Sequence, residues 1–261
     1  TFDSTVGLEI FADSEGLHVR VPAGTREEFT DSSDTAALIP GTPISHVSFG
    51  SGVSKKTTAK NSKKKATDAK DVFGEYDPKN LGVAPPYWLI NNVKRGSFAW
   101  YKPSKGKLWS EWIAIVHYDA NVAKALREKR VGLGKSGAVR EVGELHYARR
   151  GSLLLVSSTN ARVQEALARV LTKGAPPVFM AGAFDGKACA AAIRAISPNV
   201  RTDLKNTLNV FAIYAGVLQS ADFTTSIRAD DGVPVFEGHL RPRLAKEGVD
   251  LNAVDQWLAS P

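Results

Sequence analysis

The chain has 261 residues and a mass of 28.1 kDa, enough for one large domain or two small ones with a buried core. Apolar residues make up 43% and charged residues 23%, and the single cysteine, Cys189, allows no internal disulfide. This composition excludes collagen-like, wholly disordered and disulfide-stapled chains. No apolar run approaches the roughly 18–20 residues of a membrane-spanning helix, so we expect no transmembrane segment. Cys189 is expected to pack on the apolar face of a helix.

The positive charge is concentrated in one segment. Residues 55–70 hold seven lysines and one acid, Asp68, and without them the net charge falls from +7 to +1. Nucleic-acid-binding domains usually carry arginine as well as lysine on a folded surface, whereas this segment has neither arginine nor an aromatic residue. We interpret it as a solvated, flexible insert. The alternative is an arm that binds a polyanion, and its candidate binding residues are Lys55, Lys56, Lys63, Lys64 and Lys65.

The N-terminal part of the chain predicts strands separated by polar connections. Apolar and polar residues alternate on both sides of residues 13–16, which predicts a β-hairpin with its turn at Gly16. A short strand is expected over residues 44–49. The lysine-rich insert and its linker then extend over residues 54–83.

The central region predicts strands followed by a capped helix. Apolar runs indicate strands over residues 87–93, 97–101 and 108–118. Asp119 is well placed to cap the N-terminus of a helix over residues 120–130.

The glycine-rich residues 131–138 are expected to form a flexible connection to a second hairpin, which turns at Arg150-Gly151. The helix with the clearest periodicity follows, with Asn160 as its N-cap and Gly174 just past its end. Its apolar face, spaced at i, i+3, i+4, i+7 and i+8, consists of Val163, Ala166, Leu167, Val170 and Leu171.

Strand and helix patterns continue to the C-terminus. We expect a strand over residues 178–184, helices over residues 186–197 and 201–219, a hairpin at Asp231-Gly232 and a short helix that carries Trp257.

This order of elements predicts an α+β fold: a mainly antiparallel sheet, or sheets, with helices packed on one face and split β-α-β-like units. The two terminal hairpins each have an acid-rich glycine turn, which indicates a possible internal repeat or a coincidence between common turns. We expect an N-terminal hairpin and strand of a first unit (1–53), the insert (54–83), a central α+β unit (84–199) and a C-terminal part (200–261) whose helix, hairpin and helix pack back on the N-terminal part.

Four segments within roughly residues 85–240 carry a resemblance to known proteins: VHYDANVAKALREKR, GELHYARRGSLLLVSSTNARVQEALARVL, FMAGAFDGKACAAAIRAIS and FTTSIRADDGVPVFEGHL. In their order, and in features such as LLLVSS before an alanine-rich helix, they resemble a loose group of uncharacterised bacterial cell-envelope proteins. The resemblance implies an exported protein of the periplasm or cell envelope, built of repeated α+β units, with a binding or assembly role and no established catalysis. The lysine-rich insert has no counterpart in it.

No catalytic or metal-binding motif is complete in the sequence. Residues 134–136 match the end of a phosphate-binding loop, but Lys129 stands where that loop needs its first glycine. A nucleophile elbow around Ser136 fails as well, because Ala138 replaces its second glycine. No two histidines stand within five residues of each other; they are His18, His46, His117, His146 and His239. We therefore assign no catalytic residue, metal or cofactor.

Aromatic residues are concentrated between residues 87 and 118, where four of the five tryptophans fall. Aromatic side chains on a sheet can form a platform for a peptide, glycan or lipid, whereas aromatics that pack across strands and beneath helices are structural. We favour the structural interpretation for this region as a whole, and above all for Trp112 and Tyr118. The candidate binding residues are Trp100, Tyr101 and Trp109.

The leading expectation is a non-enzymatic, exported bacterial envelope domain whose partner is an unknown protein or envelope polymer. Two alternatives stay open: a polyanion- or nucleic-acid-binding protein that uses residues 55–70, and a hydrolase whose active-site residues are scattered along the chain. The sequence begins at Thr1 rather than Met, so we expect a processed or trimmed piece of a longer protein.

Overall fold

The computed structural model describes residues 9–13, 16–22, 31, 33–50, 82–102, 107, 109, 111–170, 180–196, 202–230 and 233–244. The strands are β1 (Glu9–Asp13), β2 (Gly16–Pro22), β3 (Ser45–Gly50), β4 (Arg95–Trp100), β5 (Trp112–His117), β6 (Val139–Val142), β7 (Leu145–Arg150), β8 (Leu153–Ser157), β9 (Met180–Asp185), β10 (Leu218–Asp230) and β11 (Val233–Leu244). The helices are α1 (Ser33–Ala36), α4 (Tyr87–Asn92), α5 (Ala120–Glu128), α6 (Asn160–Ala168), α7 (Gly186–Ile196) and α8 (Thr202–Val217).

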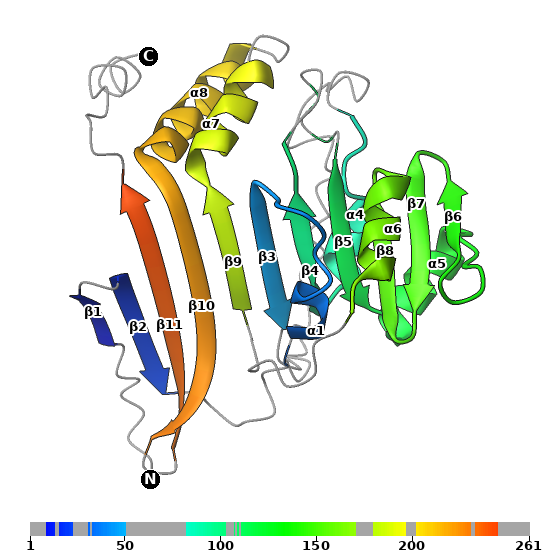
Figure 1. The fold of residues 1–261 in the computed structure, drawn as a ribbon, viewed down its shortest axis with the longest axis horizontal. Coiled ribbons are helices and arrows are strands. Elements are labelled where there is room, and N and C mark those ends of the chain that lie inside the picture. The colour runs from blue at the N-terminus through cyan, green and yellow to red at the C-terminus, as the bar shows by residue number, and fades with distance from the viewer. Residues whose placement is uncertain are drawn as a thin grey trace, which may run out of the picture.

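These strands form one open sheet in the order β1-β2-β11-β10-β9-β3-β4-β5-β8-β7-β6 (Figure 1). Every pair of neighbouring strands is antiparallel. β5 and β7 therefore run parallel to each other on either side of β8, with α5 between them in the chain, which is a split β-α-β arrangement. The α+β class with a mainly antiparallel sheet is confirmed.

The hairpins from the two ends of the chain lie side by side. β2 pairs with β11 from Pro22↔Val235 to Leu17↔Leu240, so the N-terminal hairpin continues the sheet beyond the C-terminal one. Gly16, with φ 142°, begins β2 at the expected turn. This pairing does not establish an internal repeat, which stays a prediction, as do the four proposed parts of the chain.

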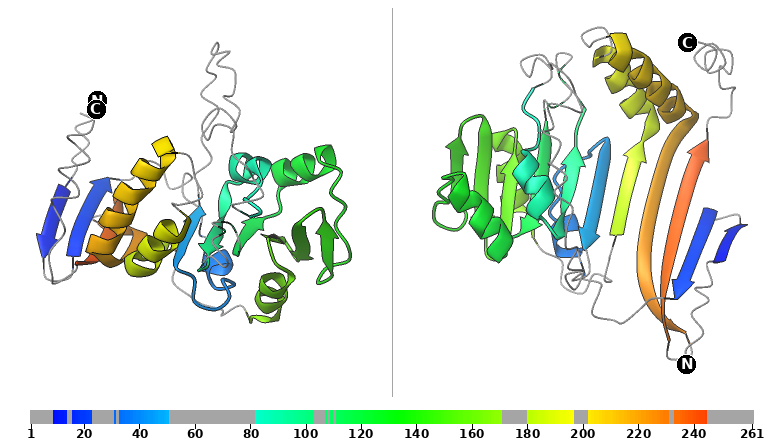
Figure 2. Two further views of the ribbon diagram at one scale, coloured as in Figure 1. Left: turned by 90° about the horizontal axis from the view of Figure 1, so that it is seen from above. Right: turned by 180° about the vertical axis from the view of Figure 1, so that it is seen from behind.

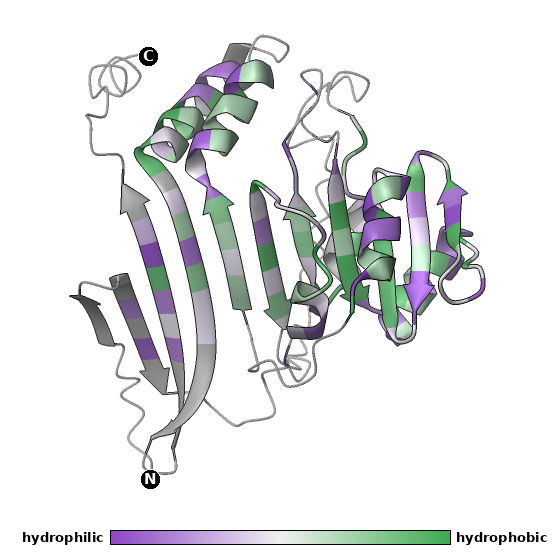
Figure 3. Cartoon of the chain, in the orientation of Figure 1, coloured by the Kyte–Doolittle hydropathy of each residue, from purple (hydrophilic) through white to green (hydrophobic). Residues whose placement is uncertain are grey.

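Helices cover both faces of the sheet around β4, β5 and β8, so the expectation that they pack on one face is not confirmed (Figure 2). Ile113 and Ile115 of β5 pack with α1 and α6 on what we call the α6 face. The alternate β5 residues pack with α4 and α5 on what we call the α5 face; they are Trp112, Ala114 and Val116. The five residues from Trp112 to Val116 are all buried, as a strand between two layers of helices requires, and β5 and β8 are mostly apolar in Figure 3.

The Asp119 cap is confirmed, since its carboxylate accepts hydrogen bonds from the backbone N–H groups of Asn121 and Val122, both at 2.9 Å. The N-cap of α6 is Thr159 rather than Asn160. This helix is also shorter than expected. The Arg150 guanidinium donates to the carbonyl oxygens of Ala166 and Arg169 at the C-terminus of α6, and beyond that point Val170 is 84% exposed instead of packed.

Two further predictions about secondary structure are wrong. Residues 87–92 form the helix α4 instead of a strand. Pro86 is the N-cap of this helix, and Leu89 is buried on the α5 face. β6 was missed, because its sequence is half charged and only pairing with β7 defines it. The short helix expected around Trp257 lies outside the described residues.

α7 and α8 pack on each other at one end of β9 and β10, and their contact is built from small side chains. Ala190, Ala192, Ala212 and Ala215 are buried there. Cys189 is buried as expected, with its Sγ 3.7 Å from the carbonyl oxygen of Ile44. Alanine contacts let the two backbones approach closely, and Phe211 and Tyr214 of α8 stay outside this contact.

Candidate functional site

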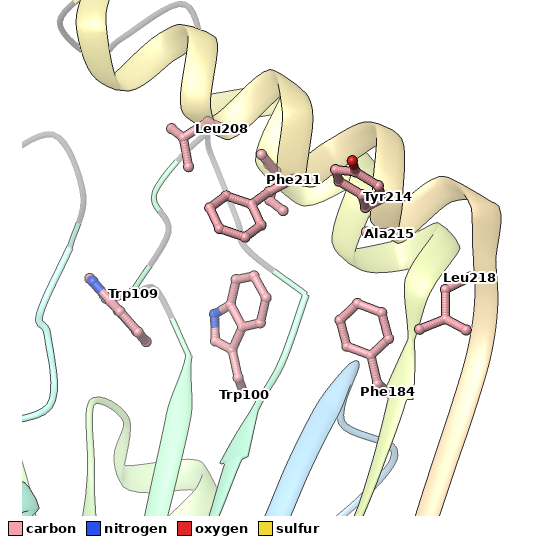
Figure 4. A pocket seen from close by; sticks show the side chains of 9 residues that line it. Trp100, Trp109, Phe184, Leu208, Phe211, Tyr214, Ala215 and Leu218 are labelled. Carbon is pink, nitrogen blue, oxygen red and sulfur yellow. The ribbon is translucent and has the colours of Figure 1, made fainter. Parts of the chain in front are cut away.

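An apolar cavity of about 430 Å³ lies between α8 and the ends of β4 and β9 (Figure 4). We call it the aromatic groove. Its lining combines aliphatic side chains of α7 and α8 with large apolar ones, among them Trp100, Trp109, Phe184, Phe211, Tyr214 and Leu218. Its volume falls within the range of small-molecule sites, which is about 300–1,000 Å³.

Two tryptophans form the sheet side of the aromatic groove. Trp100 is the last residue of β4, and its ring centroid lies 6.3 Å from that of Trp109 at an interplanar angle of 53°. Trp109 forms an isolated parallel β-bridge with Gly82, outside the named strands. Both side chains are half-buried, so each still presents part of its ring to the cavity.

Two exposed aromatic residues of α8 form the opposite side. Phe211 and Tyr214 are one helical turn apart and are 60% and 59% exposed. The neighbouring Ala212 and Ala215 are buried against α7, which fixes the orientation of α8 and leaves its aromatic side chains at the groove. Large apolar side chains that are this exposed at the mouth of a cavity are typical of interaction sites.

The described lining of the groove is almost entirely apolar. Among the lining side chains that the structure describes, polar atoms are confined to the Tyr214 hydroxyl and the indole nitrogens of Trp100 and Trp109. Within the described part of the chain, no group of three or more His, Cys, Asp or Glu residues is arranged to hold a metal ion. The groove can therefore take up an apolar group, and the described residues that line it include no carboxylate, imidazole or thiol.

Of the three predicted aromatic binding residues, the structure brings Trp100 and Trp109 together and separates Tyr101 from them. Tyr101 is 2% exposed and lies on the α6 face. Its hydroxyl donates to the Pro40 carbonyl oxygen at 2.5 Å, and the Arg162 guanidinium carbon lies 3.9 Å from its ring centroid. Burial raises the pKa of Tyr101 well above its usual range. Tyr101 thus belongs to the core.

Two further aromatic residues, Trp112 and Tyr118, were predicted to have a structural role. Trp112 is fully buried, and its indole N–H donates to the Val83 carbonyl oxygen at 2.5 Å, as its structural interpretation requires. Tyr118 packs half-buried against the α5-face cluster. The five lysines named as polyanion-binding candidates lie outside the described residues.

The aromatic residues of α8 are the part of the site that sequence reasoning missed. Phe211 is among the most exposed large apolar residues described. Neither Phe211 nor Tyr214 was singled out as a binding residue from the sequence. The available signal was a pair of aromatics one turn apart on a helix whose alanines already supply a packing face.

A second cluster of polar residues lies on the α6 face. His117 Nε2 lies 2.9 Å from an Asp34 carboxylate oxygen, and Arg95 Nη2 lies 3.2 Å from the other oxygen. Burial raises the pKa of Asp34, but the His117 hydrogen bond and the charges of His117 and Arg95 outweigh it, so the pKa lies below its ordinary value.

Three buried hydroxyl groups of α1, β3 and β4 contact one another on the same face. Ser97 Oγ lies 2.7 Å from both Thr35 Oγ1 and Ser48 Oγ, and all three residues are at most 1% exposed. A nucleophile must be able to reach its substrate. The arrangement is therefore that of a satisfied polar network, and it lends no support to the hydrolase alternative.

No protein-family model, curated protein or solved structure matches this chain. Among the described helices, none combines the length and apolar character that crossing a lipid bilayer requires.

Proposed function

We propose that this protein is a non-enzymatic binding domain and that the aromatic groove is its ligand site. The observation that carries the proposal is the exposure of Phe211 and Tyr214 beside a cavity whose other wall is the Trp100–Trp109 pair. Exposed aromatic side chains cost free energy in water, and a ligand that covers them recovers it.

The proposal extends to the place and partner of the protein. The resemblance to exported bacterial envelope proteins supports a periplasmic or cell-envelope location and a role in binding or assembly with an envelope protein or polymer. The likeness of the two terminal hairpins supports a repeated α+β unit as part of that proposal. A reporter fused to the complete gene product should show its activity outside the cytoplasm. Reporter activity inside the cytoplasm would contradict the proposed location.

The groove is tested with a neutral apolar probe, N-phenyl-1-naphthylamine, whose fluorescence rises when it leaves water. We expect saturable binding that is lost in Phe211→Ser and retained in Val170→Ser. Val170 is a matched control because it is more exposed than Phe211 and does not line the groove. Equal binding by both variants would refute the assignment of the site.

A further inference from the structure

We propose that the ligand of the aromatic groove is a single-chain anionic amphiphile, whose alkyl or acyl tail fills the groove and whose anionic head lies at its cationic rim. This inference rests on the proposed function and specifies the ligand of that same site.

Cationic residues flank the lining residues of the groove in the sequence, although the chain outside residues 55–70 is nearly neutral. Five of them stand within three sequence positions of a lining residue, and all five are exposed: Lys102, Lys107, Lys187, Arg194 and Lys205. None of the five forms an ion pair with another described residue. The Arg194 guanidinium lies at the contact between α7 and α8, where its Nη2 is 3.9 Å from the Cβ position that Gly216 lacks.

The acidic residues equally close to the lining side chains are already engaged. Glu111 accepts a hydrogen bond from Arg162 Nε at 2.8 Å, and Asp185 accepts one from the backbone N–H of Ala188 at 2.8 Å at the start of α7. Five exposed cations against these two carboxylates give a net positive charge among the residues that flank the groove in sequence, which favours an anionic head group over a cationic one.

The lining favours a hydrocarbon tail over a peptide segment. A peptide brings backbone N–H and C=O groups that need hydrogen-bond partners when they are buried. The described lining residues supply few such partners, namely the Tyr214 hydroxyl and the two indole nitrogens. A tail of methylene groups needs none, and a volume of about 430 Å³ suits a small ligand rather than a folded partner.

The test is a calorimetric titration of the whole chain, below the critical micelle concentration, with sodium octyl, decyl and dodecyl sulfate. Alkyltrimethylammonium ions of the same tail lengths are titrated in parallel. We expect affinity to rise about fourfold per added methylene group until the groove is filled. The sulfates should bind about fivefold or more tightly than the ammonium ions, and this difference should shrink as salt is added.

Two variants, each with a control, test where the tail and the head group of the ligand bind. Phe211→Ser should weaken binding of both series, and Val170→Ser should leave it unchanged. The double variant Lys102→Glu with Lys107→Glu should reduce the preference for sulfate, whereas Lys135→Glu, an exposed lysine in the loop between α5 and β6, should not.

The outcomes distinguish a failure of this inference from a failure of the proposed function. If sulfate and ammonium amphiphiles bind equally well, and Phe211→Ser still weakens both, the anionic head group is wrong and the groove remains the site. If affinity does not depend on tail length, or Phe211→Ser binds like the wild type, the site is elsewhere and the proposed function fails together with this inference.

Discussion

Gly186 offers the sharpest test of how the wall of the aromatic groove is built. It is the first residue of α7 and lies against the end of α8. A Cβ at this position would overlap the carbonyl oxygens of Ala215 and Leu218 and would lie 2.7 Å from the Leu218 carbonyl carbon. These are backbone atoms, which cannot turn aside as a flexible side chain can. The two helix ends must therefore separate if Gly186 becomes alanine.

We expect Gly186→Ala to lower the free energy of unfolding by about 2–3 kcal/mol, the upper part of the usual range for overpacked positions. For a chain of this size that corresponds to a fall in Tm of about 4–10 °C. Ala215 and Leu218 line the groove, so binding of N-phenyl-1-naphthylamine should weaken as well. Urea unfolding followed by far-UV circular dichroism measures the first effect, and a fluorescence titration under native conditions measures the second.

Gly216 provides the matched control on the facing helix. The nearest heavy atoms to a Cβ there are Ala190 Cβ and Arg194 Nη2, both at 3.9 Å, which is ordinary contact. Glycine in a helix costs roughly 0.5–1 kcal/mol relative to alanine, so Gly216→Ala should stabilise the protein by about that amount. Wild-type stability in Gly186→Ala, or a loss of more than about 1 kcal/mol in Gly216→Ala, would refute the described packing of α7 on α8.

Three other predictions concern Cys189, Ser97 and Asp34. Burial, reinforced by the nearby carboxylate that caps α7, raises the pKa of the Cys189 thiol to about 12, so a thiol reagent at pH 8 should label the native protein far more slowly than the denatured one. Ser97→Ala removes the shared partner of two buried hydroxyls and should cost about 1–3 kcal/mol in urea unfolding. The pKa of Asp34 is raised by burial but lowered further by His117 and Arg95, so its stabilising effect is present above pH 3.8 and is lost as pH falls through the lower folded pKa. Unfolding midpoints between pH 7 and pH 3 should therefore fall less steeply in Asp34→Asn than in the wild type, and equal slopes would contradict this.

Local signals in the sequence predicted those elements whose structure is decided locally. The Asp119 carboxylate needs only the next few backbone N–H groups to cap α5, and the turn at Gly151 adopts φ 59° between β7 and β8. α4 was not predicted because its residues have aromatic and β-branched side chains typical of strands, and the burial of Leu89 against α5 overrides that preference. The run from Trp112 to Val116 did contain the information that both faces of β5 are covered, since an unbroken apolar run indicates a strand buried on both sides.

The candidate site was half predicted, and the missing half has a physical reason. Trp100 and Trp109 stood out because aromatic residues gather in one stretch of the sequence. Phe211 lies about a hundred residues further along, on a helix whose periodicity shows which side chains share a face and not what lies opposite that face. Only the pairing of β9 with β3, and of β3 with β4, brings the end of α8 to the tryptophans.

The position of the groove follows from the way the sheet is covered. On the α5 face one cluster extends from α4 and α5 to Trp100 and Trp109, and another gathers Ala212, Ala215 and Phe184 around α7 and α8. Trp100 packs against both clusters, so it spans the interval that neither set of helices fills. Side chains from both clusters line the cavity, and it opens where α8 turns Phe211 toward solvent. The cavity lies in the interval between the two sets of helices, and under the proposed function an apolar ligand completes the packing there.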